Sequence, residues 1–448
     1  MEPRDHAPRI TVVGTGYLGA THAVCMAELG FEVLGLDTDA DRVARLALGE
    51  LPMYEPGLDD LLKRQVADGR LRFTTRYDEA AAFGDVHFLC VGTPQRDDGY
   101  AADLSSLEAA VLALAPLLTR RCLVVGKSTV PAGTADRLAR RIVRLAPAPD
   151  VELAWNPEFL REGFAVEDTL HPNRLVVGVR SAWAEQTLRA VYAPLIADGV
   201  PFVSVDFATA ELVKVAANSF LATKISFANA MSEVCARVNA DVVSLVEALA
   251  ADDRIGGDFL HPGVGFGGGC LPKDIRAFMA RADELGVSGA VAFLREVDAI
   301  NVRQRRRIVD LSRALLGGSF IGRNVGVLGA AFKPNSDDIR DSPALAVSAA
   351  IGAEGGRITI YDPAALANAR RAYPGFRCRG SVAGAAEGAD LLLLLTEWSE
   401  FVDLDPERLG AAVAEHNIVD GRNVLDPARW RAAGWRYVGL GRPFYAAG

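Results

Sequence analysis

A single cysteine in a glycine-rich segment, GFGGGCLPKD at 265–274, carries the strongest chemical signal in this chain. Cys270 is followed by Lys273, whose charge favours a thiolate, and by Asp274, a carboxylate able to move protons. Four glycines precede the cysteine and suggest backbone that passes close to a ligand: Gly265, Gly267, Gly268 and Gly269. The alternative is a structural cysteine in a glycine turn, but such cysteines usually have apolar neighbours. The segment therefore predicts a reactive thiol.

The amino-terminal segment RITVVGTGYLGATHAVCMAELGFEVLGLD has the order strand, glycine turn, helix and strand. In such a unit Gly14 allows a tight turn, Gly16 lets a pyrophosphate approach the backbone, and Gly19 lets the helix pack on the strand. Asp37 ends the second strand, where a carboxylate can bind a ribose diol and repel a 2'-phosphate. We therefore predict a dinucleotide site that prefers NAD to NADP.

Alternating strand and helix signals continue beyond Asp37 and predict one doubly wound α/β domain. The strands are expected at 87–91, 122–126, 175–179 and 202–205. Polar turns follow two of them, GTP at 92–94 and STVPAGT at 128–134, on the edge of the sheet where ligands bind. Ordinary turns would explain these two segments equally well.

An unbroken helical pattern from about 206 to 239 predicts a helix of about 50 Å, long enough to join two domains. Lys214 and Asn218 are four residues apart on it and share one face. A solvated surface lysine is the plain alternative. The apolar neighbours of the pair, such as Val213 and Val215, favour burial and a role toward a substrate.

A second α/β domain follows, with strands expected at 325–328, 357–361, 390–395 and 417–419. Its first strand leads into AAFKPNSDDIRDSP, where Pro334 discourages a helix and leaves Lys333 and Arg340 in a loop suited to phosphates. The predicted fold class is α/β, with two doubly wound, Rossmann-like parallel-sheet domains joined by a long central helix. The expected domains are an NAD-binding domain at 1–205, a central helical dimerisation and cysteine region at 206–310, and a nucleotide-sugar domain at 311–448.

Composition restricts the class of protein further. The chain has 448 residues, half of them hydrophobic, and a net charge of −9, which gives no general attraction to nucleic acid or an anionic membrane. Six scattered cysteines form no CxxC pair and fit a reduced cytoplasmic protein without a metal centre: Cys25, Cys90, Cys122, Cys235, Cys270 and Cys378. The most apolar run, Leu391 to Leu395, is too short to cross a bilayer and predicts a buried strand.

Seven motifs in order now carry a family resemblance over essentially the whole chain. They are GTGYLG, STVPAGT, NPEFLREG at 156–163, KVAANSFLATKISFAN at 214–229, GFGGGCLPKD, AFKPNSDDIRDSP, and DGRNVLD at 420–426. On these motifs the chain resembles the UDP-glucose/GDP-mannose dehydrogenases.

The resemblance implies roles for named residues. The catalytic residues would be Cys270 as nucleophile, Lys214, Asn218 and Asp274 around the reacting carbon, and Glu158 and Thr129 in water and proton transfer. The NAD contacts would be Gly14, Gly16, Tyr17, Leu18, Gly19, Asp37, Arg42, Gly92, Thr93, Pro94, Ser128, Thr129, Glu162, Lys273 and Arg340. The sugar nucleotide would contact Glu158, Phe159, Leu160, Arg161, Lys214, Asn218, Phe259, Leu260, Gly265, Phe266, Gly267, Phe332, Lys333 and Arg422. Arg254 would reach the neighbouring subunit's site in a dimer built on the long helix.

The family chemistry is a four-electron oxidation of a primary alcohol to an acid, with two hydride transfers and one hydration. A water held by Asp274 would take the hydroxyl proton, while Lys214 and Asn218 stabilise charge on the sugar oxygen. Cys270 would add to the aldehyde, and the thioester formed by the second oxidation would be hydrolysed by water activated near Glu158 or Asp274. This scheme requires two NAD for each sugar.

One departure and several alternatives accompany the resemblance. The family often has serine where this chain has Gly269. DGYAADLS at 98–105 and DGRNVLD favour glucose over GDP-mannose, and CLPKD is unlike the pattern of relatives that oxidise N-acetylated hexosamines. One methyl separates uracil from thymine, a difference of about 1–3 kcal/mol, so dTDP-glucose stays open. Outside the family, the alternatives are a two-electron hydroxyacid dehydrogenase and a non-catalytic nucleotide-sugar sensor.

Overall fold

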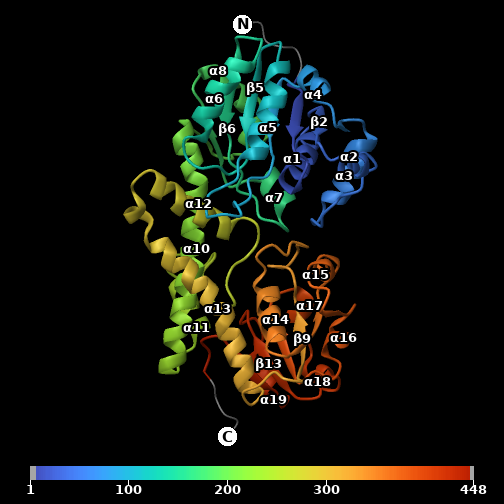
Figure 1. Cartoon of the computed structure of the whole chain (residues 1–448), viewed down its shortest axis with the longest axis vertical. Coiled ribbons are helices and arrows are strands. Elements are labelled where there is room, and N and C mark those ends of the chain that lie inside the picture. The colour runs from blue at the N-terminus through green and yellow to red at the C-terminus, as the bar shows by residue number, and fades with distance from the viewer. Residues whose placement is uncertain (1–6, 444–448) are drawn as a thin grey trace. The chain divides into compact units, whose positions relative to one another are not determined.

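The computed structural model describes residues 7–443 of the chain. Within this part of the chain there are two compact units: residues up to Ala217 together with Arg276–Glu284, and Asn218–Ile275 together with the residues from Leu285 onward. Each unit contains its own sheet, as Figure 1 shows. No helix in this part of the chain is both long and apolar enough to cross a membrane.

The sheet of the first unit has the strand order β3-β2-β1-β4-β5-β6-β7-β8. Its strands are β1 (Ile10–Val13), β2 (Val33–Leu36), β3 (Leu71–Thr74), β4 (Val86–Leu89), β5 (Cys122–Gly126), β6 (Val151–Trp155), β7 (Leu175–Gly178) and β8 (Phe202–Val205). All neighbours are parallel except β6 and β7, which meet through the single antiparallel pair Trp155 and Gly178. The strand order reverses between β1 and β4, and the carboxyl ends of the strands at such a point form a ligand crevice.

Helices cover this sheet, and Figure 1 shows α1 and α5 beside its strands. The helices of the first unit that precede β8 are α1 (Tyr17–Glu28), α2 (Ala40–Ala47), α3 (Leu58–Ala67), α4 (Tyr77–Phe83), α5 (Ser105–Leu114), η1 (Ala115–Leu117), α6 (Thr134–Leu145), α7 (Ala165–Leu170), α8 (Ala182–Val191) and α9 (Ala193–Ala197). β1, β2 and β4 are buried along their whole length, which explains their mainly apolar sequences.

The predicted long helix is α10 (Phe207–Val238), which runs for 32 residues without a break. It is followed by α11 (Val242–Ala250), α12 (Leu271–Glu284), η2 (Ser288–Val291) and α13 (Phe293–Leu315). Lys214 and Asn218 both lie on α10 and both are buried, as their apolar neighbours predicted.

The second unit contains a wholly parallel sheet in the order β11-β10-β9-β12-β13-β14. Its strands are β9 (Asn324–Leu328), β10 (Arg357–Tyr361), β11 (Arg377–Cys378), β12 (Leu391–Leu394), β13 (Asn417–Asp420) and β14 (Arg436–Gly439). The helices around it are α14 (Pro343–Ala353), α15 (Leu366–Ala372), α16 (Val382–Ala386), α17 (Ser399–Val402), α18 (Pro406–Gly410) and α19 (Pro427–Ala432). The prediction of two parallel-sheet α/β domains with a long central helix is confirmed.

Candidate active site

The glycine turn after β1 has the backbone that a dinucleotide site requires. Gly14 has a φ of +88°, in the left-handed region that favours glycine. A side chain on Gly19 would begin 1.7 Å from the carbonyl oxygen of Gly14, so only glycine lets α1 start this close to β1. A Cβ on Gly16 would meet nothing within 4 Å, which leaves open space at the amino end of α1. This open space beside a helix amino terminus fits a pyrophosphate.

Asp37 follows β2 directly and is fixed by several donors. One of its oxygens accepts hydrogen bonds from the backbone N–H of Thr15 (2.7 Å) and the guanidinium of Arg42 (3.0 Å), and the other accepts from the N–H of Asp39 (3.0 Å). Burial raises the pKa of Asp37, but these donors together hold it below its ordinary value. Asp37 is therefore an ionised acceptor, as binding of the ribose diol of NAD requires.

Two further turns meet at the carboxyl ends of β4 and β5. The hydroxyl of Thr93 donates to the carbonyl of Thr129 (2.7 Å), and the hydroxyl of Ser128 donates to the carbonyl of Val91 (2.6 Å). Gly92 and Pro94 beside them are exposed. The structure thus brings together the GTP and STVPAGT segments, which sequence reasoning alone could not distinguish from ordinary turns.

A carboxylate that sequence reasoning missed, Glu55, ties the start of α1 to the loop that carries Glu162. Glu55 accepts hydrogen bonds from the backbone N–H groups of Gly163 and Ala165, each at 2.7 Å, and from the hydroxyl of Tyr17. Burial, and then the Glu55 carboxylate, raise the pKa of Tyr17 far above its ordinary value. Tyr17 and Glu162 are therefore held in one buried network.

Glu158 and Lys214 form an ion pair within the first unit. The Lys214 ammonium lies 3.2 Å from one Glu158 oxygen, and both side chains are almost wholly buried. The other Glu158 oxygen accepts from the N–H of Leu160 (2.7 Å), and the Lys214 ammonium lies 5.5 Å from the ring centroid of Phe159. Arg161 is exposed and forms an ion pair with Asp168. The pair supplies a carboxylate and an ammonium beside each other, which can share a proton with a bound water or substrate.

The second unit contains the thiol and its carboxylate. Cys270 directly precedes α12, and its carbonyl accepts from the N–H of Asp274 (2.9 Å). It is the exposed cysteine, whereas Cys25, Cys90, Cys122 and Cys235 are buried. A thiol at a helix amino terminus has a lowered pKa because the helix dipole favours the thiolate. The position of Cys270 therefore favours a nucleophile.

Asp274 is 1% exposed and links two of the predicted residues. It accepts a hydrogen bond from the side-chain amide of Asn218 (2.7 Å) and forms an ion pair with Lys273. The predicted effect of Lys273 on the thiolate stays a prediction, and Lys273 is also the ion-pair partner of Asp274.

The glycines before Cys270 pack against protein groups. A Cβ on Gly265 would lie 2.4 Å from the side chain of Asn301, and one on Gly268 would lie 2.7 Å from the ring of Phe332. A Cβ on Gly269 would lie 2.3 Å from the guanidinium carbon of Arg340. Close packing within the second unit is thus one reason for these glycines, and the approach of a ligand stays a prediction.

Buried asparagines, which sequence reasoning missed, fix the same loop. Asn301 exchanges two hydrogen bonds with the backbone of Phe266, at 2.7 and 3.0 Å. Asn229 on α10 accepts from the N–H of Gly263 (2.8 Å). A buried asparagine in a helix is the sequence signal that could have indicated them, since a buried amide requires partners.

Arg422 connects three segments of the second unit. Its guanidinium donates to the carbonyls of Leu395 (2.8 Å), Phe332 (2.9 Å) and Gly265 (3.3 Å). It also lies 3.0 Å from a carboxylate oxygen of Glu397. Arg422 therefore holds together the segments of Leu395, Phe332 and Gly265. This structural role is separate from its predicted contact with the sugar nucleotide.

The remaining predicted residues of the second unit differ in their exposure. Leu260, Phe266 and Gly267 are buried, while Phe259, Phe332 and Lys333 are partly buried. Phe259 has a φ of +63°, a backbone conformation that aromatic residues rarely adopt and that clusters at functional sites. Arg254 and Arg340 are exposed, and each forms an ion pair with an aspartate two residues before it.

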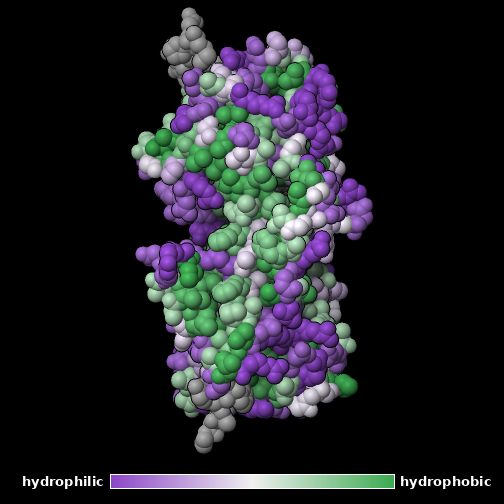
Figure 2. Space-filling model, turned by 90° about the vertical axis from the view of Figure 1, so that its left-hand side faces the viewer, coloured by the Kyte–Doolittle hydropathy of each residue, from purple (hydrophilic) through white to green (hydrophobic). Residues whose placement is uncertain are grey.

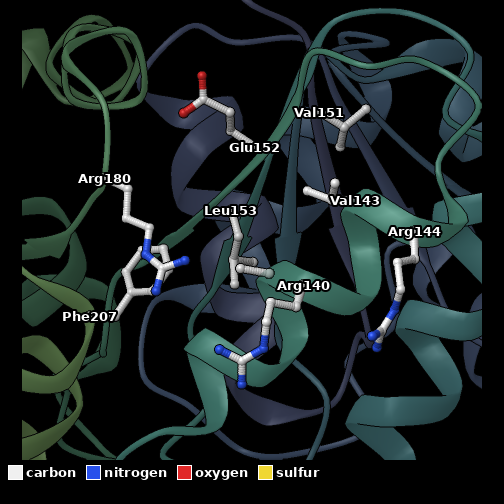
Figure 3. A pocket seen from close by; sticks show the side chains of 9 residues that line it. Arg140, Val143, Arg144, Val151, Glu152, Leu153, Arg180 and Phe207 are labelled. Atoms are coloured by element: carbon white, nitrogen blue, oxygen red, sulfur yellow. The ribbon is translucent and has the colours of Figure 1, made fainter.

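A surface hollow of about 410 Å³ lies elsewhere on the first unit and is drawn in Figure 3. It is lined by residues of α6 and the first part of β6, together with Arg180 and Phe207. Arg140 and Arg180 both pair with Asp136. The hollow lies at the amino end of β6, whereas Asn156 and Glu158 follow its carboxyl end, so it is not part of the candidate site. Among residues 7–443, no group of three or more His, Cys, Asp or Glu side chains could hold a metal ion.

A doubly wound domain with an open glycine turn and an ionised acid after β2 defines the first unit as that of an NAD-dependent oxidoreductase. Comparison with known families identifies the whole chain. Residues 8–196 match the NAD binding domain of the UDP-glucose/GDP-mannose dehydrogenase family, residues 208–303 its central domain, and residues 326–427 its UDP binding domain. The chain belongs to this family and is an NAD-dependent dehydrogenase of nucleotide sugars.

Individual relatives agree with the family. The chain is 42% identical over 438 residues to the UDP-glucose 6-dehydrogenase of Rhizobium meliloti, covering 97% of this chain and 100% of the relative. It is 41% identical over 446 residues to the UDP-glucose 6-dehydrogenase of Pseudomonas aeruginosa, covering 97% and 98%. The solved structure of a UDP-glucose dehydrogenase from the archaeon Pyrobaculum islandicum superposes with a TM-score of 0.90 at 37% identity, covering 99% of this chain and 100% of that one.

Proposed function

We propose that this protein oxidises UDP-glucose at C6 to UDP-glucuronate, with water and two NAD consumed for each sugar. The observation that carries the proposal is the exposed thiol of Cys270 at the amino end of α12, one turn before buried Asp274. A two-electron alcohol oxidation needs no thiol, whereas oxidation to the acid benefits from a covalent intermediate. Relatives at 41–42% identity are named for UDP-glucose.

The predicted catalytic residues take successive roles in the proposed reaction. Asp274, oriented by Asn218, holds the water that removes the hydroxyl proton in the first oxidation. The Cys270 thiolate then adds to the aldehyde carbon, and Lys214 and Asn218 stabilise the negative charge on the sugar oxygen. The second oxidation converts the resulting thiohemiacetal into a thioester. Water activated near Glu158 or Asp274 hydrolyses this thioester, with Thr129 assisting, and releases the acid and the free thiol. Bound NAD accepts one hydride in each of the two oxidations.

The same proposal assigns the binding residues and the domains. We assign NAD to residues 1–205, the thiol and dimer region to 206–310, and the nucleotide part of the substrate to 311–448. The open space at Gly16 and the ionised Asp37 support the first assignment. The expected phosphate ligands Lys333 and Arg340 lie on the loop between β9 and α14, within the match to the UDP binding domain.

A substrate panel tests the function directly. Purified protein is incubated with NAD and, separately, UDP-glucose, dTDP-glucose or GDP-mannose, and the sugar product is identified by mass spectrometry. We expect UDP-glucuronate to form with the highest kcat/KM. A higher kcat/KM with dTDP-glucose would reassign the base, and an aldehyde as the final product would refute the four-electron scheme.

We further propose that the chain forms a homodimer through α10. Four apolar side chains of this helix are exposed in the second unit: Phe220, Phe227, Val234 and Val238. Phe220, Phe227 and Val234 follow one another at intervals of seven residues, so they form one stripe along the helix. Figure 2 views the side on which α10 lies and shows apolar surface there. A second copy of the chain, presenting the same stripe, is the occupant we propose.

Arg254 belongs to this proposal. Lys224 of α10 donates to the carbonyls of Ile255 and Gly256, each at 3.1 Å. These bonds attach the turn that contains Arg254 to α10. The Arg254 side chain is 88% exposed and extends from this turn. Its placement beside the proposed dimer stripe supports donation to the neighbouring subunit's sugar-nucleotide site.

Light scattering during size-exclusion chromatography tests the dimer. We expect Phe227→Glu to convert the protein to monomers, because a carboxylate in an apolar interface loses its hydration. Ile321→Glu is the matched control, since Ile321 is 80% exposed but lies outside the stripe. A Phe227→Glu protein that remains dimeric would refute the α10 interface.

A further inference from the structure

Lys127 is a buried lysine to which the reaction outlined above assigns no role. It lies between the end of β5 and Ser128 and is 8% exposed. Its ammonium donates to the side-chain carbonyl of Asn156 (3.0 Å) and lies 5.9 Å from the ring centroid of Phe88. Within residues 7–443 the Lys127 ammonium forms no ion pair with a carboxylate at 4.0 Å or less.

The surroundings of the Lys127 ammonium include groups of the proposed site. Burial is the main cause that lowers the pKa of Lys127; Cys90 and Glu158 act to raise it, and Lys214 acts to lower it. His22, on the neighbouring helix α1, is fully buried, and its pKa is lowered by burial and by Lys127. The charges of Glu158 and Lys214 thus act on the pKa of Lys127 in opposite directions.

Asn156 is the group through which Lys127 acts on the loop of Glu158. Its side-chain carbonyl accepts from Lys127 and also from the hydroxyl of Tyr192 (2.6 Å). Its side-chain amide donates to the carbonyl of Val176 (2.8 Å), and its backbone N–H donates to the carbonyl of Gly126 (2.8 Å). Asn156 is thus fixed from β5, β7 and the end of α8, two residues before Glu158.

We propose that Lys127 is a positioning residue that holds the Glu158 loop at a fixed place relative to Thr129. Lys127 lies two residues before Thr129 in the sequence. Its hydrogen-bond partner Asn156 lies two residues before Glu158. The Lys127 ammonium therefore connects the starts of two segments, one carrying Thr129 and the other Glu158. These are the residues that we assign to water and proton transfer. This inference rests on the proposed function, because it assumes that Glu158 and Thr129 serve thioester hydrolysis.

The fold alone does not require an ammonium at this position. Burying a charge without a carboxylate partner is costly, and an apolar side chain of similar length would fill the space at lower cost. Methionine is such a side chain, since it is unbranched and adapts to its surroundings. If Lys127 only filled space in the fold, methionine would therefore replace it at least as well. If Lys127 positions the Glu158 loop, Lys127→Met would lose that function.

The test compares Lys127→Met with Tyr192→Phe in the full-length enzyme. Tyr192→Phe removes the other donor to the same Asn156 oxygen while leaving Lys127 in place. Three quantities are measured for each: kcat and KM for UDP-glucose and NAD, the midpoint of thermal unfolding, and the fraction of Cys270 that carries a covalent sugar-nucleotide adduct after an acid quench. Intact-protein mass spectrometry gives the last quantity.

We expect Lys127→Met to lower kcat by roughly tenfold to a hundredfold with KM within about threefold of wild type, because displaced catalytic groups slow the chemical step. The unfolding midpoint of Lys127→Met is expected to equal or exceed that of wild type, and its Cys270 adduct is expected to accumulate. The kcat of Tyr192→Phe is expected to fall by less than about threefold. A folded Lys127→Met enzyme with wild-type kcat, or one whose kcat falls only together with its unfolding midpoint, would overturn the inference.

A second variant keeps the test decisive if Lys127→Met does not fold. Lys127→Gln retains a hydrogen-bond donor without the charge, and we expect a smaller fall in kcat with the same adduct accumulation. Wild-type kcat in a folded Lys127→Gln enzyme would overturn the inference. A wild-type enzyme that forms other than two NADH per UDP-glucose would instead refute the proposed function, so the two failures are distinguishable.

Discussion

Alanine substitutions at Gly268 and Gly269, neighbours in the cysteine loop, should have very different effects on stability. Gly268 has a φ of +84°, and a Cβ there would lie 2.7–3.0 Å from three ring atoms of Phe332. The left-handed backbone costs a non-glycine residue about 1–2 kcal/mol, and overpacking costs about 1–3 kcal/mol. Gly268→Ala should therefore lower the free energy of unfolding by about 2–5 kcal/mol.

Gly269→Ala is the matched control. Its Cβ would lie 2.3–2.6 Å from guanidinium atoms of Arg340, but that side chain is 62% exposed and can move aside. Gly269 lacks a positive φ, so the backbone accepts a side chain, and we expect a loss below about 1 kcal/mol. The same reasoning covers Gly269→Ser.

Urea unfolding measures the difference between the two variants. The midpoint and slope are compared for wild type, Gly268→Ala and Gly269→Ala, and the rate of Cys270 alkylation by iodoacetamide reports the local structure of the loop. Equal midpoints for the two variants, or a Gly268→Ala protein as stable as wild type, would refute the packing argument.

Three further outcomes follow from the site. Asn218→Ala should lower the free energy of unfolding by about 1–3 kcal/mol and kcat at least tenfold, because buried Asp274 loses its amide donor; urea unfolding and initial rates measure both. Asp37→Asn should raise the KM for NAD relative to NADP, since the charge that repels a 2'-phosphate is removed; initial rates with each cofactor measure the ratio. The folded-state pKa of Asp37 is lowered, so its ionised form stabilises the fold above the unfolded pKa near 3.8, and this contribution is lost as pH falls through the folded value. The stability difference between wild type and Asp37→Asn should therefore be largest near pH 7 and shrink toward pH 3; an unchanged difference would contradict the pKa argument.

Local sequence patterns predicted the elements that are buried along their whole length. β1, β4 and β12 are mainly apolar runs, and parallel strands covered on both faces have this composition. Four strands were missed: β3, β6, β11 and β14. Three of them lie at sheet edges and are partly exposed, so their apolar runs are broken. β6 lies inside the sheet, so edge exposure does not explain why it was missed. The antiparallel meeting of β6 and β7 depends on long-range pairing, which no local pattern encodes.

Some residues of the candidate site were predicted from local motifs, whereas others depend on contacts between distant parts of the sequence. Asn218 and Asp274 were predicted from motifs, and the structure joins them by a hydrogen bond across 56 residues of sequence. Glu55 was missed because its partner Gly163 is 108 residues away, and only the fold brings them together. The packing of Gly268 against Phe332 was missed for the same reason, since the two residues are distant in the chain.

The central claim is that a Cys270 thioester links two oxidations of one sugar. The most direct test is the NADH formed per molecule of limiting UDP-glucose, measured at exhaustion with excess NAD for wild type and Cys270→Ser. The account predicts two NADH per sugar for wild type and failure of Cys270→Ser to complete the second oxidation. One NADH per sugar in the wild type, or a Cys270→Ser enzyme that reaches two at the wild-type rate, would contradict it.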